Sequence, residues 1–173
     1  MSKRLSKKEK ANMSRYQAEI EERIRGIFAE MDELVLKNHG TRLSGASLPI
    51  TFGFSKRSWA SYSLYLRKKG KKYVRENEHF RFSLRHFARK DEFSLTDSTF
   101  RNIVIHEYAH YMVEHLYPKA AREEAAHGET WEECCYELGI TPIVKYIDEQ
   151  LYKEWAHLLL PTSDEPSATI EEQ

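Results

Sequence analysis

Apolar residues in the first part of the chain repeat with the period of an α-helix. Between about Ser14 and Lys37, seven of them form one stripe: Ile20, Ile24, Ile27, Phe28, Met31, Leu34 and Val35. A stripe with a 3.6-residue period is typical of a helix that packs one face on a core. Asn38-His39-Gly40 supplies a plausible end for this helix. The residues before it, 1–13, are strongly basic and are expected to form a flexible arm.

The apolar period then changes from 3.6 to two, which is typical of strands with one buried face. Three segments alternate in this way: Ile50, Phe52 and Phe54, then Ala60, Tyr62, Leu64 and Leu66, and then Phe80, Phe82 and Leu84. Gly70 lies between two lysine pairs, which predicts a turn with a basic tip between the second and third segments. We therefore expect a small three-stranded, mainly antiparallel sheet.

The remaining apolar segments predict three helices. Thr96 can act as N-cap of a helix that runs to about Tyr117, where Pro118 stops it. A short helix is expected from about Gly128 to Leu138, and a last helix from Pro142 to about Leu160. Residues 161–173 are polar and acidic and are expected to be a disordered tail. The fold class predicted is α+β, with one domain over residues 14–160.

Length and composition limit the class of protein. A chain of 173 residues can bury a core as one domain without disulfide bonds. Its two cysteines, Cys134 and Cys135, are adjacent and cannot link distant segments. No apolar run approaches the ~18 residues that span a bilayer, and the basic amino terminus has no apolar core behind it. A cytoplasmic protein with no membrane partner is expected.

The net charge of zero is a balance between opposite segments. Residues 55–90 contain 12 Lys and Arg against 2 Asp and Glu, and residues 91–173 contain 5 against 18. The basic segment interleaves cations with Trp59, Tyr62, Tyr65 and Tyr73, a mixture that can contact phosphates and stack on exposed bases. The ordinary alternative is a solvated strand edge with aromatic core residues. The candidate nucleic-acid-binding residues are Lys56, Arg57, Arg67, Lys68, Lys69, Lys71, Lys72 and Arg75.

The strongest chemical signal is the string His106-Glu107-Tyr108-Ala109-His110, which matches the HExxH pattern of zinc peptidases. Residues four apart lie on the same face of a helix, so both imidazoles can share one ion. Glu107 lies beside them, where its carboxylate can take a proton from a metal-bound water during attack on a peptide carbonyl. The apolar run Ile103-Val104-Ile105 indicates that this helix is buried, where two histidines and a glutamate are costly without a shared role.

A catalytic zinc site usually has three protein ligands, so a third residue is needed. His115 is five residues beyond His110 and therefore points about 140° away from the first two ligands. Glu132 or Glu133, from a following helix, is a second alternative. His127, before a glycine at the start of a short helix, is the favoured candidate. The metzincin pattern does not fit, because Val113 and Leu116 stand where glycine and the third histidine are required.

HEYAH followed by His127-Gly128-Glu129-Thr130-Trp131 resembles the SprT-like (Spartan-type) zinc metallopeptidases, which have HExxH and then HGxx with an aromatic residue. The resemblance spans roughly residues 14–140 and also covers the helix, the short strands and the FRFSLRHF segment. It implies a zincin-like fold in which His106, His110 and His127 bind one zinc ion and Glu107 is catalytic. Nothing after residue 140 resembles the four-cysteine zinc ribbon of bacterial members.

The resemblance also sets the functional expectation. It implies a zinc endopeptidase with protein or peptide substrates. Eukaryotic members cleave proteins crosslinked to DNA, so DNA-bound or DNA-crosslinked proteins are candidate substrates, and single-stranded or damaged DNA is a candidate partner. The alternative is a regulatory or binding module with a structural zinc and little peptidase activity. An intact Glu107 favours the enzyme, because a purely structural zinc site needs no base.

Overall fold

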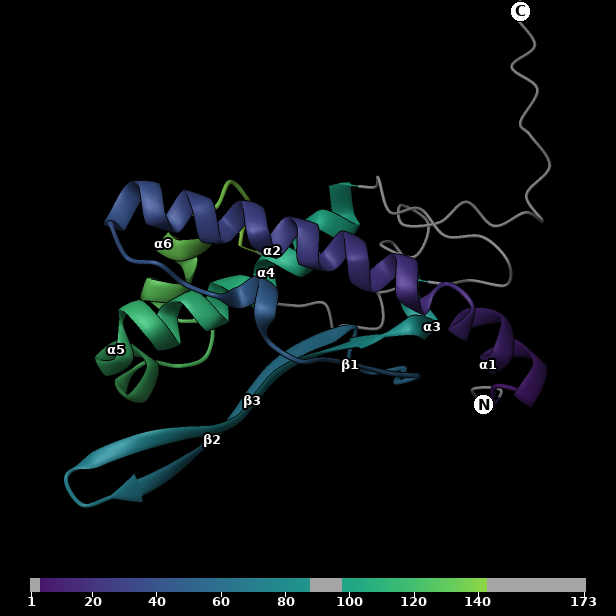
Figure 1. Ribbon diagram of the computed structural model, residues 1–173, viewed down its shortest axis with the longest axis horizontal. Coiled ribbons are helices and arrows are strands. Elements are labelled where there is room, and N and C mark those ends of the chain that lie inside the picture. The colour runs from purple at the N-terminus through teal and green to yellow at the C-terminus, as the bar shows by residue number, and fades with distance from the viewer. Residues whose placement is uncertain (1–3, 88–97, 143–173) are drawn as a thin grey trace, which may run out of the picture.

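Residues 4–87 and 98–142, the part of the chain that this computed structural model describes, form an α+β fold with a small mixed sheet (Figure 1). None of the helices in these ranges combines the length and the apolarity needed to cross a membrane. Thr96 and the expected last helix and tail, at residues 143–173, lie outside the described residues. In chain order the elements are α1 (Lys7–Ser14), α2 (Gln17–His39), the 3₁₀ helix η1 (Gly45–Ser47), β1 (Ile50–Gly53), β2 (Ala60–Lys69), β3 (Lys72–Ser83), α3 (Leu84–Phe87), α4 (Ser98–Leu116), α5 (Pro118–Glu123) and α6 (Glu129–Glu137).

The long helix α2 has the buried face that the apolar period predicts. Six of the seven stripe residues are buried, and Leu34 packs partly buried against them. The helix ends at His39, within the expected Asn38-His39-Gly40 stop, and the φ of 67° at Gly40 lets its N–H reach the carbonyl of Leu36. A left-handed residue at this place is a common helix end and favours glycine.

The amino-terminal segment differs from the flexible arm expected for residues 1–13. Residues 7–14 form α1, which a reciprocal capping box starts: the Ser6 side chain accepts from the Glu9 N–H, and the Glu9 carboxylate accepts from the Ser6 N–H. Met13 buries its side chain in the core, and the Lys10 ammonium lies 5.4 Å from the ring centre of Phe54. The basic composition suggested disorder, whereas the Ser-x-x-Glu pattern is a helix start.

The sheet has the strand order β1-β3-β2 and corrects the mainly antiparallel arrangement expected from the sequence. β2 and β3 form the expected antiparallel hairpin around Gly70, but β1 pairs with β3 in parallel. β3 is central because Phe80 and Phe82 are both fully buried there. Alternation of apolar residues predicts a strand but does not specify which neighbour it pairs with.

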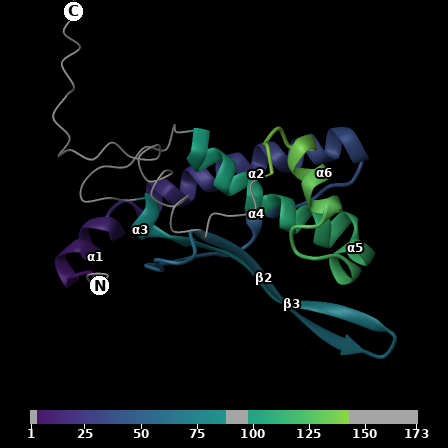
Figure 2. The ribbon, with the colours of Figure 1, turned by 180° about the vertical axis from the view of Figure 1, so that it is seen from behind.

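The β2–β3 hairpin is longer than the body of the sheet needs. Its far half projects beyond the helices, as both views of the ribbon show (Figures 1 and 2). The lysine-rich turn lies at the end of this projection. The near half of the hairpin packs on α4.

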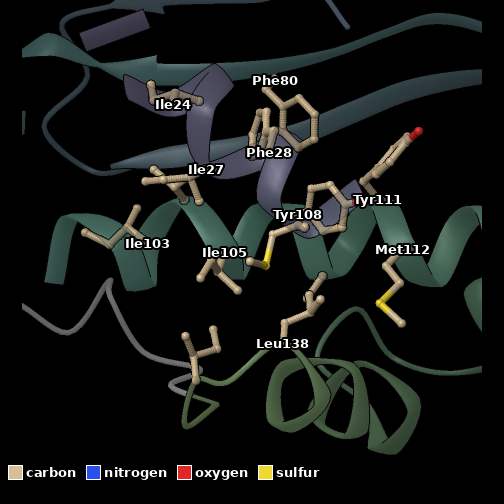
Figure 3. Close-up of a cluster of buried hydrophobic side chains, with 14 of the residues drawn as sticks. Ile24, Ile27, Phe28, Phe80, Ile103, Ile105, Tyr108, Tyr111, Met112 and Leu138 are labelled. Atoms are coloured by element: carbon tan, nitrogen blue, oxygen red, sulfur yellow. The ribbon is translucent and has the colours of Figure 1, made fainter. Parts of the chain in front are cut away.

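Helix α4 is the centre of the core, because it packs against α2 and the sheet on one side and against α6 on the other. Figure 3 shows Tyr108 close to Phe28 and Phe80, with Leu138 on the opposite side of the helix. The Tyr108 hydroxyl donates to Asp32 at 2.6 Å, and Asp32 also accepts from the N–H groups of Gly45 and Ala46. Hydrogen bonds to a charged carboxylate are among the stronger ones in proteins. This contact fixes α4 against α2, and with it the position of the HExxH motif.

Candidate metal centre

Three histidine side chains from two separate segments converge beside α4. His106 and His110 lie one turn apart on α4, and His127 lies in the short connection between α5 and α6. One ring nitrogen of each lies within 4.8 Å of the other two. In the described part of the chain, no other group of three metal-binding side chains comes this close. The three histidines that the sequence selected are therefore close enough to hold a metal ion.

The spacing of the imidazoles fits a tetrahedral ion. Two nitrogen ligands at 2.0–2.1 Å from a tetrahedral zinc lie about 3.3–3.4 Å apart. The Nε2 atoms of His106 and His127 are 3.3 Å apart, and the His106 and His110 rings have a centroid separation of 5.1 Å. Without a metal, the first pair can instead share a hydrogen bond, with one ring as donor.

The environment of the rings keeps them neutral, which is the state that binds a metal. Burial lowers the pKa of all three, and the neighbouring imidazoles lower those of His106 and His110 further, the latter to about 3. Trp131 of α6 is 1% exposed and lies 4.6–5.3 Å from all three ring centres. Its indole N–H donates to the carbonyl of His106 at 3.4 Å. The buried tryptophan thus forms the apolar wall of the site.

Glu107 lies next to the histidines and is 6% exposed. Its Oε1 is 3.9 Å from Nε2 of His106. Burial raises the pKa of Glu107 to about 8, although a hydrogen bond from the Tyr62 backbone in β2 acts in the opposite direction. A carboxyl group whose pKa lies near neutral pH can both accept and release a proton. No pattern in the sequence predicts this contribution of Tyr62.

A tight turn brings His127 back to α4. The Gly128 N–H donates to the Ala125 carbonyl at 2.9 Å, and the Glu124 carboxylate accepts from both the N–H and the hydroxyl of Thr130. A Cβ at residue 128 would lie 2.9 Å from the Glu124 carboxylate and 3.1 Å from the Ala125 carbonyl. A side chain at residue 128 would therefore push its neighbours aside by a few tenths of an ångström. Glu124 has no motif around it, and sequence reasoning did not select it.

The alternative third ligands lie elsewhere. Nε2 of His115 is 2.6 Å from Oε1 of Glu78, on the side of α4 that faces the sheet. Glu132 and Glu133 are exposed on α6 and do not join the histidine group. Among these candidates, only His127 has the required position.

The histidines and Glu107 line a cleft of about 350 Å³. One wall is residues 58–62, which lead into β2, and the other is residues 120–127. β2 is the outer strand of the sheet in the described structure, and its first residues line this cleft. Most of the accessible lining is apolar. An extended chain could therefore lie beside β2 and pass over the histidines.

The basic residues expected to bind nucleic acid do not form one patch. Five exposed cations surround the hairpin tip: Arg67, Lys68, Lys69, Lys71 and Lys72. Lys56 and Arg57 lie in the connection between β1 and β2, at the opposite end of β2. Arg75 donates to Glu114 of α4. Among the interleaved aromatic residues, Tyr65 and Tyr73 are 64% and 59% exposed on the hairpin, whereas Trp59 is buried and Tyr62 packs against Phe80 and Tyr111.

Comparison with protein-family models, with curated proteins and with solved structures finds no significant match to this chain. The resemblance to SprT-like metallopeptidases therefore rests on the sequence motifs and the order of elements over residues 14–140.

Proposed function

We propose that the protein is a zinc-dependent endopeptidase of the SprT-like type. The observation that carries the proposal is the position of Glu107, a buried carboxylate beside three converging neutral imidazoles at the base of a cleft. A structural zinc site needs ligands but no buried carboxylate with a raised pKa. The combination is typical of a site that moves protons.

Each residue has a distinct task in this proposal. His106, His110 and His127 hold the metal through neutral ring nitrogens. A zinc ion bound there would polarise a peptide carbonyl and lower the pKa of a water molecule to about 7. Glu107 accepts a proton from the attacking water and delivers it to the leaving amine. The hydrogen bond from the Tyr62 backbone orients the Glu107 carboxylate for both transfers.

The shape of the cleft supports a peptide substrate. A peptide in extended conformation can pair with the edge of an outer strand through main-chain hydrogen bonds. As an outer strand, β2 offers such an edge, and its first residues line one wall of the cleft that also contains Glu107. Main-chain pairing does not depend on substrate sequence, which suits an endopeptidase with broad specificity.

The projecting hairpin favours substrates associated with nucleic acid. Its tip combines five cations with the exposed rings of Tyr65 and Tyr73. Cations contact phosphates and exposed rings stack on unpaired bases, so single-stranded DNA is the partner that this tip fits best. DNA-bound or DNA-crosslinked proteins are then the proposed substrates. The competing function, a regulatory module with a structural zinc, predicts the same metal binding without proteolysis.

Two substitutions test the peptidase. Glu107→Gln should keep about one zinc ion per chain and lose casein cleavage by roughly 100-fold or more, because it removes only the proton acceptor. His127→Ala should bind zinc much more weakly and lose activity. His39→Ala is the matched control, since this histidine pairs with Glu137 away from the cleft and should retain both properties. Equal cleavage by wild type and Glu107→Gln would rule out the proposed base, and zinc without any cleavage would favour the regulatory module.

The hairpin is tested separately through salt dependence. Each phosphate contact to single-stranded DNA contributes about 0.7 to the slope of log affinity against log salt. Changing Lys68, Lys69, Lys71 and Lys72 to alanine should therefore lower the slope by roughly 3 in a fluorescence anisotropy titration. Lys56 and Arg57, changed together, are the control at the other end of β2. A slope that the tip variant does not alter would remove DNA from the proposal.

A further inference from the structure

The segment that carries the third histidine has little hydrophobic anchorage. None of the residues of α5 is buried, and Ala121 is the partly buried one that packs against the core. A helix of six residues is also too short to be stable by itself. Polar contacts at its carboxyl end therefore hold it. Arg122, in the last turn of the helix, binds Glu114 of α4. The Glu124 carboxylate, directly after the helix, binds Thr130 of α6.

Glu114 is the centre of a buried ion cluster that joins three elements. Its side chain is 5% exposed, and both carboxylate oxygens accept from Arg122 of α5, at 2.7 and 2.5 Å. Arg75 of β3 donates to the same carboxylate at 2.9 Å and to the Glu114 carbonyl at 2.8 Å. The carboxylate therefore neutralises part of the charge of two arginines that come from different elements, β3 and α5.

The place of Glu114 on α4 connects this cluster to the metal centre. It follows Glu107 by seven residues, two helical turns, and so lies on the same face of α4. It lines the same cleft as His106, His110 and His127 but does not belong to the histidine group. Four residues separate Arg122 from His127 along the chain, and the Gly128 turn follows directly.

We infer that Glu114 is a positioning residue for the metal centre: by holding Arg122 it fixes α5, and α5 in turn places His127 within reach of His106 and His110. Loss of its charge leaves Arg75 and Arg122 as two neighbouring cations that repel each other. This repulsion moves the weakly anchored α5 more easily than the hairpin, because the hydrogen bonds between β2 and β3 hold the hairpin in place. The first two ligands stay in place on α4, and the third is lost or displaced. The inference rests on the proposed metal centre.

The test is zinc affinity, measured by competition with a chelator of known affinity on full-length protein. Residues that orient metal ligands typically contribute 10- to 100-fold to metal affinity. Glu114→Gln should therefore bind zinc at least about 10-fold more weakly than wild type. Arg122→Met should also weaken zinc binding. Arg122→Lys, which keeps one charged contact, should bind zinc more tightly than Arg122→Met but less tightly than wild type. Glu76→Gln is the matched control, because it breaks the exposed ion pair with Arg67 on the same hairpin and should leave affinity unchanged.

A second measurement separates positioning from general destabilisation. In a His127→Ala background, Glu114→Gln should cause no further loss of affinity, since the ligand through which it acts is absent. The visible spectrum of the cobalt-substituted protein should likewise change from wild type to Glu114→Gln, because it reports coordination geometry. If Glu114→Gln does not fold, Arg122→Met and Arg122→Lys give the same comparison from a more exposed side chain.

The results distinguish the inference from the proposed function. Unchanged affinity in Glu114→Gln and Arg122→Met, with normal zinc binding by wild type, would overturn the role of Glu114 and leave the peptidase proposal intact. An equal loss in the presence and absence of His127 would also overturn it. Wild-type protein that binds no zinc would remove the metal centre itself, and the positioning role with it.

Discussion

Replacing Glu107 by glutamine should stabilise the metal-free protein at neutral and alkaline pH. The carboxyl group is 6% exposed, and burial raises its pKa from 4.5 to about 8. Between these two pH values the folded protein retains a proton that the unfolded chain has lost. The free energy of unfolding of wild type therefore falls as pH rises from about 4.5 to 8. Glutamine has nearly the same shape and no charge, so the variant does not show this loss.

The size of the effect follows from the two pKa values. At pH 5 the raised pKa lowers the free energy of unfolding of wild type by about 1 kcal/mol, and at pH 7 it lowers it by roughly 3 kcal/mol. For a chain of this size, 1 kcal/mol corresponds to about 2–4 °C in melting temperature. The variant should thus gain several degrees over wild type between pH 5 and pH 7 in thermal melts with a chelator present. The three histidines titrate in both proteins, so their contributions cancel in the comparison.

Two comparisons make this prediction specific. Glu114→Gln should show the opposite trend, because Arg122 and Arg75 hold the pKa of Glu114 below its usual value despite burial. That carboxylate stabilises the fold above pH 4.5, so the variant should fall below wild type at pH 7 and approach it in acid. Added zinc should reduce the advantage of Glu107→Gln, since a nearby cation favours the carboxylate. A difference in melting temperature between wild type and Glu107→Gln that stays constant from pH 5 to pH 8 would refute the reasoning.

Two further substitutions test how the site is built. Gly128→Ala should weaken zinc binding in the chelator assay, because its Cβ would lie 3.1 Å from the Ala125 carbonyl and would push the turn that carries His127 by a few tenths of an ångström; unchanged affinity would show that the turn absorbs this shift without moving His127. Tyr108→Phe removes the donor 2.6 Å from Asp32 and should lower the free energy of unfolding by about 1–2 kcal/mol in urea, with the slope of the transition unchanged. A loss below about 0.3 kcal/mol would mean that Asp32 is satisfied by the Gly45 and Ala46 N–H groups alone.

The parts of the structure that the sequence predicted well depend on local patterns. The stripe of α2 and the apolar run before His106 each specify a helix and its buried face within a few turns. The hairpin around Gly70 has its turn signal between the two strands. In these elements, the residues that determine the structure are close together in the chain.

Contacts between distant segments could not be predicted in the same way. The alternation in Ile50 and Phe52 predicts a strand, but the parallel pairing of β1 with β3 depends on the path of residues 54–59. α1 was missed for another reason, because its lysines suggested a solvated arm although Ser6 and Glu9 form a capping box. The capping hydrogen bonds start a helix in this segment, although its basic composition is typical of a flexible arm.

In the candidate site, too, local patterns predicted some features, and contacts between distant segments were missed. HExxH places two imidazoles and a carboxylate by helical geometry alone, and the glycine after His127 marks the turn of the third. The sequence has no periodic signal for the contact of Arg122 with Glu114, since Tyr117 and Pro118 interrupt the helix between them. It also gave no sign that Lys56 and Arg57 lie far from the hairpin tip. Residues adjacent in a charge-rich segment can lie at opposite ends of a ten-residue strand.

Metal binding and local folding should be coupled at this site. The folded protein keeps three imidazoles neutral, with pKa values below 6.5, so the metal-free protein loses stability as pH falls from 6.5 toward about 3. α5 buries no side chain that would compensate. A metal ion would link residues 118–128 to α4 more directly than any contact of the described chain, because it bonds His127 to both α4 histidines at once. Metal binding would then order residues 118–128, which supply one of its ligands. The ion cluster around Glu114 would determine how well this segment is already ordered in the metal-free protein.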